Sequence, residues 1–106
     1  MVSDFYGPFN YTNAGVSAHA PDDIGVYYCG VPNSKDMNVY YVGRAAQGKS
    51  SIRSRLQDHL SENKWRDVTC FGYKTTTTEQ EAIDLEAREI KRLQPKYNQV
   101  GKTYTY

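Results

Sequence analysis

The sequence predicts a domain of the mixed α/β class, of the α+β type, whose strands and helices follow one another in the order β-β-α-β-α. Its 106 residues match the size of one domain, and a hydrophobic fraction of 39% allows a modest core. Two neighbouring runs rich in β-branched and aromatic residues predict paired strands. Two later segments carry apolar residues at the three-to-four spacing of helices, with a further strand between them.

Residues 1–23 show no clear periodicity. They are rich in Tyr, Phe, Asn, Gly and Pro and end in the turn-like segment Ala20 to Asp23. We therefore expect an irregular leader with room for one short strand. Its aromatic side chains, among them Phe5 and Phe9, are expected to pack on the sheet, because packing is a more common use of such rings than stacking on nucleic-acid bases.

The first two strands are predicted at Ile24 to Val31 and at Asn38 to Gly43, which are dense in Val, Tyr and Ile. Between them lies Pro32 to Asp36, a segment with the Pro, Asn, Ser and Asp residues of a hairpin loop. The two strands are therefore expected to pair antiparallel.

The first helix is predicted from Ser51 to Glu62, because Ile52, Leu56 and Leu60 recur at helical spacing. The segment Asp67 to Lys74 follows and has the composition of a third strand. These two elements complete the β-β-α-β part of the order.

A capping box predicts the start of the second helix, since Thr78 is followed three residues later by Glu81. Pro95 ends that helix. Residues 100–106 are expected to form a loosely ordered C-terminal tail.

Several classes of protein are disfavoured by composition. No stretch approaches the roughly 18 apolar residues of a membrane span, and the first residues lack the pattern of a secretion signal. We therefore expect a soluble, cytoplasmic chain with no membrane partner. The two cysteines, Cys29 and Cys70, form no Cys-x-x-Cys pattern and are expected to be buried apolar side chains.

The charge of the chain is locally uneven. A formal net charge of +1 does not by itself indicate a nucleic-acid partner. Between Arg44 and Arg66, however, cations outnumber the acids Asp58 and Glu62, which makes this segment a candidate phosphate-facing surface. The cations are Arg44, Lys49, Arg53, Arg55, Lys64 and Arg66.

Glu86 is the most informative acidic residue on physical grounds. Apolar residues surround it on one face of the second helix, at Ala82, Ile83, Ile90 and Leu93. A carboxylate placed there requires a cation, a metal ion or a hydrogen-bond donor. The spacing leaves two interpretations open: a structural ion pair, for instance with Arg55 or another basic residue, or a functional carboxylate.

Arg55 and His59 lie four residues apart on one face of the first helix. The arginine has the donor geometry to bind a phosphate, and the histidine can orient or transfer a proton. The alternative, a solvated arginine beside a histidine at the edge of the core, is the more common outcome for such a pair taken alone.

Taken together, the short motifs resemble those of the GIY-YIG nuclease superfamily. The two strand triplets are Gly25-Val26-Tyr27 and Tyr41-Val42-Gly43, and Arg44 follows the second. The helix residues Arg55 and His59 come next in the order of that family. The closing signature then reads as follows: Leu85-Glu86, Ile90-Lys91 and Pro95-Lys96-Tyr97-Asn98. The resemblance covers about Ile24 to Gln99, so residues 24–99 are expected to form the nuclease domain between the leader and the tail.

The resemblance implies a three-stranded antiparallel sheet flanked by helices, and a metal-dependent endonuclease that hydrolyses phosphodiester bonds of DNA. Glu86 would hold a single Mg²⁺ or Mn²⁺ ion, and Arg55 would neutralise charge in the transition state. Tyr27 or Tyr41 would be the general base, with Tyr27 preferred, and His59 would accept or relay its proton.

The same resemblance places further residues near the substrate. Arg44 would contact phosphate in place of a family lysine, and Asn98 would fix the geometry of the substrate-binding region beside the sheet. The locally basic segment, independently of the resemblance, adds Lys49 and Arg53 as candidate substrate-binding residues. The expected partner is DNA, with branched or nicked forms included. The alternative is a catalytically silent domain of the same fold that binds nucleic acid or protein, against which the intact set of Glu86, Arg55, His59 and Asn98 counts.

Overall fold

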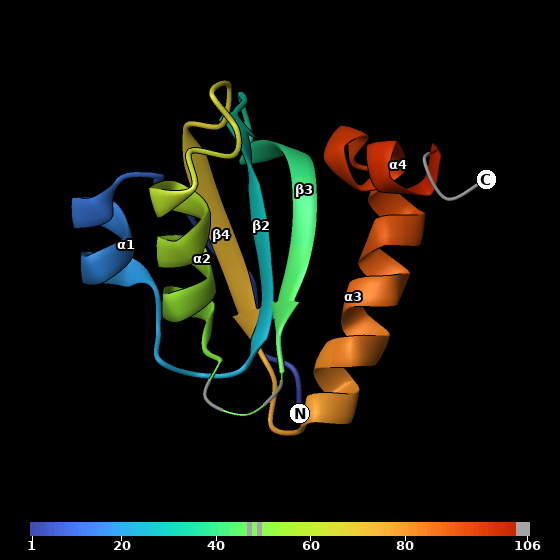
Figure 1. The fold of residues 1–106 in the computed structure, drawn as a ribbon. Helices are drawn as coiled ribbons and strands as arrows, with labels where there is room; N and C mark the ends of the chain where they lie inside the picture. The colour runs from blue at the N-terminus through green and yellow to red at the C-terminus, as the bar shows by residue number, and fades with distance from the viewer. Residues whose placement is uncertain (47, 49, 104–106) are drawn as a thin grey trace.

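The computed structural model describes residues 1–46, 48 and 50–103, with side chains described up to residue 99. It confirms the α+β class and all of the predicted elements (Figure 1). The elements, in chain order, are β1 (Tyr6–Asn10), α1 (Asn13–His19), β2 (Gly25–Pro32), β3 (Met37–Ala45), α2 (Ile52–Ser61), β4 (Cys70–Thr75), α3 (Glu79–Leu93) and α4 (Lys96–Thr103).

The sheet has four strands in the order β1-β4-β2-β3, and not the expected three. The additional strand comes from the N-terminal segment, where β1 pairs antiparallel with β4 and places Phe9 opposite Phe71. Helix α1 follows directly, capped by the side chain of Thr12. The leader was expected to be irregular with room for one short strand; β1 is that strand, but the segment is otherwise more regular than expected, because it also contains α1 and pairs with β4 despite a side-chain pattern without periodicity.

The aromatic residues of this segment pack on the sheet, as expected. The ring centroids of Phe9 and Phe71 are 5.6 Å apart, and those of Phe5 and Tyr28 are 5.4 Å apart in an edge-to-face arrangement. Burial of these rings stabilises the attachment of β1 to the outer side of β4.

Helices cover both faces of the sheet, with α1 and α2 on one side and α3 and α4 on the other (Figure 1). Because successive side chains of a strand point to opposite faces, Tyr27 and Tyr28 enter different cores. Tyr27 packs with Ile52 and Leu56 on the α2 side, whereas Tyr28 packs with Leu85 on the α3 side. Both cysteines are free and buried, as predicted.

The capping signals in the sequence mark the helix ends correctly. The hydroxyl of Thr78 accepts a hydrogen bond from the backbone N–H of Glu81, and the carboxylate of Glu81 accepts one from the backbone N–H of Thr78. At the other end, Gln94 adopts a left-handed conformation with φ of 48° before Pro95. The chain then continues as α4 to Thr103, so the expected loose tail is wrong for residues 100–103, and residues 104–106 lie outside the described part.

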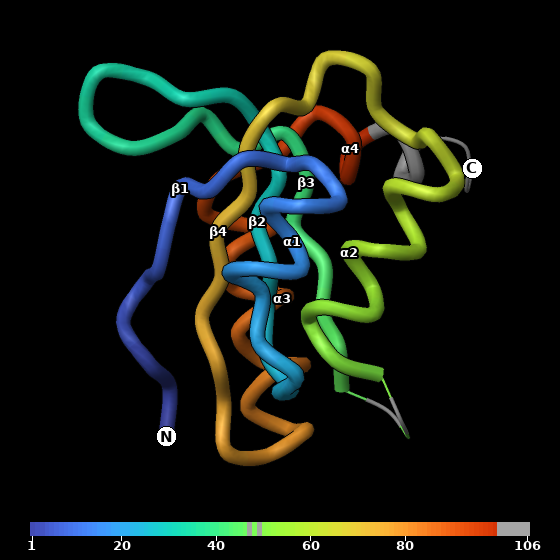
Figure 2. Tube along the Cα trace, turned by 90° about the vertical axis from the view of Figure 1, so that its left-hand side faces the viewer, coloured from blue at the N-terminus to red at the C-terminus, as the bar shows by residue number. Residues whose placement is uncertain are grey.

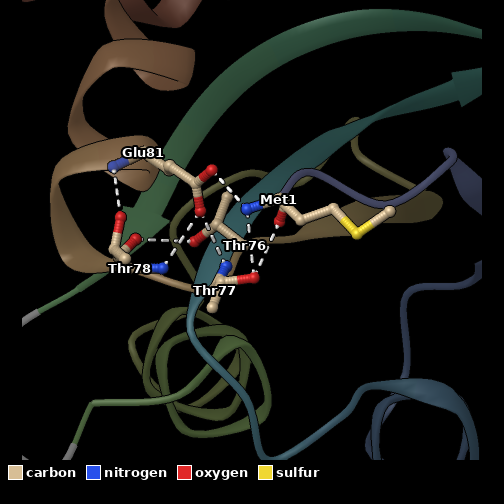
Figure 3. A network of polar contacts seen from close by, with 5 residues as sticks. All are labelled: Met1, Thr76, Thr77, Thr78 and Glu81. Atoms are coloured by element: carbon tan, nitrogen blue, oxygen red, sulfur yellow. Dashed lines mark hydrogen bonds and ion pairs between the residues drawn. The ribbon is translucent and has the colours of Figure 1, made fainter.

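The first residue is bound to the start of α3 (Figure 3). The ammonium group of Met1 forms an ion pair with Glu81 and donates to the hydroxyl of Thr77 at 3.1 Å. Val2 forms a β-bridge with Thr76, and the N-terminal segment runs beside β4 (Figure 2). No helix within residues 1–46, 48 and 50–103 has the length and apolar character to cross a membrane.

Glu89 is the most buried carboxylate among the described residues, with a side chain 4% exposed. It lies on the α3 face that packs on the sheet, together with Ala82 and Leu85. The hydroxyl of Tyr28 donates to it at 2.7 Å, and the guanidinium of Arg92 binds it through two hydrogen bonds of 2.6 and 3.0 Å. Arg92 holds the pKa of Glu89 below its ordinary value, so the carboxylate is charged at neutral pH.

We predict that Glu89→Ala lowers the free energy of unfolding by about 2 kcal/mol, because the buried hydroxyl of Tyr28 loses its acceptor. Urea denaturation followed by circular dichroism measures this change. Asp84→Ala is the matched control, since Asp84 is an exposed acid on the same helix. An equal effect of both substitutions would contradict a structural role for Glu89.

Candidate active site

A polar hollow of about 330 Å³ lies at the edge of the sheet, where β3 approaches α2 and α3. Most of the residues predicted to act in catalysis line it, and polar atoms dominate its surface. The lining residues are Tyr27, Tyr41, Arg44, Ala46, Ser50, Arg55 and Glu86. Ala46 and Ser50 were not expected there, since their residue types carry no signal for this chemistry in the sequence.

The register between β2 and β3 brings the two tyrosines together. Tyr27 lies opposite Gly43, and Cys29 lies opposite Tyr41, so both tyrosines point to the α2 side with ring centroids 6.2 Å apart. A Cβ atom on Gly43 would lie 2.5 Å from the Cζ and hydroxyl oxygen of Tyr27. Gly43 is therefore required for the ring of Tyr27 to reach the hollow. This contact explains why the tyrosine of the first triplet occurs together with the glycine of the second.

Tyr27 forms a buried pair with His59. The ring of Tyr27 is 1% exposed, and its hydroxyl oxygen lies 2.8 Å from Nε2 of His59. Burial lowers the pKa of His59 to about 4, helped by the positive charge of Arg55. Nδ1 of His59 has no hydrogen bond to any described residue, although the carboxylate of Glu62 is 3.8 Å away. The imidazole is thus neutral at pH 7 and shares one hydrogen bond with the phenol, in which the tautomer of the ring sets the donor.

Two cations face the phenols of the hollow. Burial raises the pKa of Tyr27 far above its ordinary value, while Arg55 acts in the opposite direction. Burial likewise raises the pKa of Tyr41, with the negative charge of Glu86 as a second cause. The side chains of Arg44 and Arg55 are 38% and 39% exposed, so both guanidinium groups reach solvent and an approaching phosphate.

Glu86 is paired with Arg44 and not with Arg55. Its carboxylate accepts from the guanidinium of Arg44, and its side chain is 17% exposed. Arg55 instead lies 3.7 Å from the carboxylate of Asp58 on its own helix. Because β3 is an edge strand, Arg44 and Glu86 on the α3 side reach around it to the tyrosines on the α2 side. Glu86 therefore forms an ion pair, one of the two possibilities left open by the sequence, and this pair with Arg44 lies in the same hollow as the two tyrosines.

The hollow suits a divalent cation bound through one protein carboxylate. Glu86 is the only acidic residue that lines it, and carboxylate oxygen is the ligand type that Mg²⁺ and Mn²⁺ prefer. Within residues 1–46, 48 and 50–103, no group of three or more acidic, His or Cys side chains is placed to hold a metal ion. Water and substrate oxygens would therefore complete the coordination of an ion bound here.

The remaining predicted residues lie elsewhere. The Asn98 side chain pairs with the backbone of Val42, donating to its carbonyl at 3.0 Å and accepting from its N–H at 2.9 Å. Arg53 donates to the carbonyl of Ala20 at the end of α1 and does not line the hollow. Both side chains therefore have structural partners, and the bonds of Asn98 to β3 place it beside the sheet. Lys49 lies outside the described residues.

Comparison with known proteins accounts for this arrangement. Residues 23–99 match the UvrC-like GIY-YIG domain. The chain belongs to this family. The match covers the strand triplets, the α2 residues and Glu86.

Curated relatives of this family member are named UvrABC system protein C. The chain is 38% identical over 99 residues to that of Methanosphaera stadtmanae and 37% identical over 94 residues to that of Clostridioides difficile, covering 81% of this chain in both cases. It is 40% identical to the Rickettsia felis protein over 75 residues, or 66% of this chain. The matched region spans only 16%, 15% and 12% of the length of these three relatives.

We predict that the imidazole of His59 stays neutral until the pH falls to about 4, whereas in the unfolded chain it titrates near its ordinary value of 6.5. Since the folded-state pKa is the lower one, the contribution of His59 to stability is complete above about pH 6.5 and is lost as the pH falls toward 4. The free energy of unfolding should drop by roughly 1–2 kcal/mol between pH 7 and pH 5 from this residue.

Proton NMR titration of the His59 ring, assigned with His59→Gln, measures the midpoint directly. Urea denaturation of both proteins at the two pH values measures the stability change, and the variant should lack this part of the pH dependence. A midpoint near pH 6.5 would show that His59 is not buried against Tyr27.

Proposed function

We propose that the domain is a metal-dependent endonuclease that hydrolyses phosphodiester bonds of DNA. The observation that carries this proposal is the convergence of two phenols, two guanidinium groups and one carboxylate on a single polar hollow. Such a set can bind a phosphate, stabilise the negative charge of its transition state and activate a nucleophile. Membership of the GIY-YIG family supports the same reaction class.

Each lining residue has a role that its position supports. Glu86 would hold one Mg²⁺ or Mn²⁺ ion, which when bound stabilises negative charge on phosphate and leaving-group oxygens. Arg55 is directed at the hollow from α2 and would neutralise charge on the phosphate as it is attacked. Asn98 is a positioning residue, because its two bonds hold the β3 backbone at Val42, the residue between Tyr41 and Gly43.

The pair of Tyr27 and His59 supports general-base chemistry on water. Tyr27 is protonated at neutral pH and donates to the neutral imidazole, so its oxygen keeps lone pairs directed toward the hollow. A water that binds this oxygen can transfer a proton to it as the phenolic proton moves to Nε2 of His59. Arg55 favours loss of the phenolic proton, because it lowers the pKa of Tyr27 against the effect of burial, while its charge opposes the positive charge that His59 gains.

Tyr41 is the second phenol of the hollow and the less suited base. Tyr41 is only partly buried, unlike Tyr27, and the negative charge of Glu86 raises the pKa of Tyr41 in addition to burial. The ring of Tyr41 contacts that of His59 at 5.9 Å, and no hydrogen bond joins these two side chains among the described residues. Tyr41 is therefore assigned to holding the ring of Tyr27 and orienting the phosphate.

Arg44 is proposed to exchange partners when DNA binds. In the free protein its guanidinium neutralises Glu86, which stabilises that carboxylate but competes with a metal ion for it. A phosphate entering the hollow offers Arg44 a second anionic partner with matching geometry. Movement of Arg44 to the phosphate would free the carboxylate, so that DNA and metal ion strengthen each other's binding.

We predict that Glu86→Gln lowers the rate of DNA cleavage at least about 100-fold while DNA binding persists, because the amide is a poor metal ligand of unchanged size. Cleavage is measured on supercoiled plasmid and on nicked and branched DNA with Mg²⁺, Mn²⁺ or chelator. Asp84→Asn, on an exposed face of the same helix, is the control. Unchanged cleavage by Glu86→Gln would refute the metal assignment, and DNA binding by a wild-type chain that cuts none of these substrates would favour the silent binding domain.

We further predict that Arg44→Met binds Mn²⁺ about five- to tenfold more tightly than wild type in the absence of DNA, since a partly exposed ion pair contributes on the order of 1 kcal/mol. Electron paramagnetic resonance of free Mn²⁺ measures the affinity. Arg55→Met is the matched control, because Arg55 lines the same hollow without pairing with Glu86. An affinity for Mn²⁺ that is equal in Arg44→Met and wild type would exclude the competition.

A further inference from the structure

Trp65 carries the clearest feature that the proposed catalytic scheme leaves unexplained. It is the only tryptophan of the chain and lies in the loop between α2 and β4. Its ring contacts two residues of the site, with centroid distances of 4.7 Å to Tyr41 and 4.8 Å to His59. The aromatic surface that begins at the catalytic hollow thus continues onto this loop.

The aromatic surface extends beyond Trp65 to α4. The ring of Tyr97 lies 6.1 Å from that of Trp65 with an angle of only 19° between the planes. Tyr41, Trp65 and Tyr97 are all partly exposed. The loop and α4 lie at the same end of the sheet (Figures 1 and 2), so rings from three separate segments form one continuous surface. We call Tyr41, Trp65 and Tyr97 the aromatic strip.

Positive charge flanks this strip. Lys64 and Arg66, the neighbours of Trp65 in the chain, are both exposed and form no ion pair with another described residue. Lys96 lies 5.0 Å from the ring centroid of Tyr97, although its charge is shared with Asp67 at 2.8 Å. Partly exposed rings between cations are the arrangement with which proteins bind single-stranded nucleic acid, because bases stack on the rings and phosphates approach the cations.

We infer that the aromatic strip binds unpaired nucleobases next to the phosphate held in the hollow, and that Trp65 is the principal stacking residue. The inference rests on the proposed function, because it places this strip beside the scissile phosphate of a DNA strand. Paired bases are covered by their neighbours in the duplex, so a stacking surface favours DNA that is single-stranded or locally unpaired. Trp65 would therefore direct the nuclease to such DNA.

A simpler alternative is that Trp65 only packs. It also contacts Tyr11, with ring centroids 6.4 Å apart, and belongs to the periphery of the core on the α2 side. Packing alone accounts for the buried part of the ring. Packing does not account for the exposed cations on both sides of Trp65 in the chain, or for the contact of its ring with residues of the catalytic site. The two interpretations predict different changes in fluorescence.

The single tryptophan allows a direct test. The intrinsic fluorescence of the wild-type chain is recorded in chelator, so that nothing is cut, during titration with an eight-nucleotide oligothymidylate. The same titration is made with an abasic oligonucleotide of equal length and charge, and with a duplex. We expect quenching by the oligothymidylate and little change with the other two, because only unpaired bases can stack on Trp65. Equal quenching by all three, or none by the oligothymidylate, would overturn the inference.

Variants test the contribution to affinity. Fluorescence anisotropy of a labelled oligothymidylate should show binding about fivefold or more weaker for Trp65→Leu, which keeps an apolar side chain, and near wild-type binding for Trp65→Phe, which keeps a ring. Tyr6→Leu is the matched control, since Tyr6 is an exposed ring on β1, at the opposite edge of the sheet from β3. Equal loss in Trp65→Leu and Trp65→Phe, or none in either, would contradict stacking.

The outcome is separable from that of the proposed function. Cleavage that depends on Glu86 but shows no preference for unpaired DNA and no quenching of Trp65 would support the nuclease function and contradict base binding by the aromatic strip. Base-dependent quenching in a chain that does not cleave DNA would support the aromatic strip as a binding site and contradict the nuclease function. A circular dichroism melt of each variant, unchanged from wild type, shows that a loss of binding is not a loss of folding.

Discussion

The antiparallel register of β2 with β3 is the constraint on which the site depends. It sets Tyr27 opposite Gly43, and the missing side chain of that glycine is the space that the phenol occupies. A shift of one residue would turn every side chain of β3 to the other face, separating Tyr41 from Tyr27 and Arg44 from Glu86. Asn98 stabilises this register from outside, since its amide completes the hydrogen bonding of Val42 on the free edge of the strand.

Placement at the edge of the sheet explains how so many polar groups come together without a large desolvation cost. Tyr27 and His59 are buried and hydrogen-bonded to each other, whereas Arg44 and Arg55 keep their charged ends in solvent. Glu86 lies between these two environments and is neutralised by Arg44. A carboxylate fully buried on α3 would need permanent partners, and Glu89 shows what those partners look like, with Tyr28 and Arg92 bound to it.

The comparison of Glu86 with Glu89 shows where inference from the sequence reaches its limit. Both acids have apolar neighbours at helical spacing, so periodicity cannot decide which one enters the core. The α3 surface that packs on the sheet contains Ala82, Leu85 and Glu89, and it is set by the crossing of the helix over the sheet. Glu86 was singled out by its apolar neighbours and by its place in an ordered series of motifs, whereas the structure puts it in the hollow through its reach around β3.

Elements with strong local signals were predicted well, and those that depend on pairing were not. The capping box of Thr78 and the hairpin between β2 and β3 are encoded by neighbouring residues. Strand β1 depends on β4, some sixty positions away, and α4 follows a proline that correctly predicts the end of α3 but says nothing of a new helix. The roles of Arg53 and Trp65 were missed for the same reason, since their partners Ala20, Tyr41 and Tyr97 are brought together only by the complete fold. Residues that depend on such long-range contacts are those whose function a motif cannot report, and in this domain they include Trp65, whose ring packs against Tyr41 and His59.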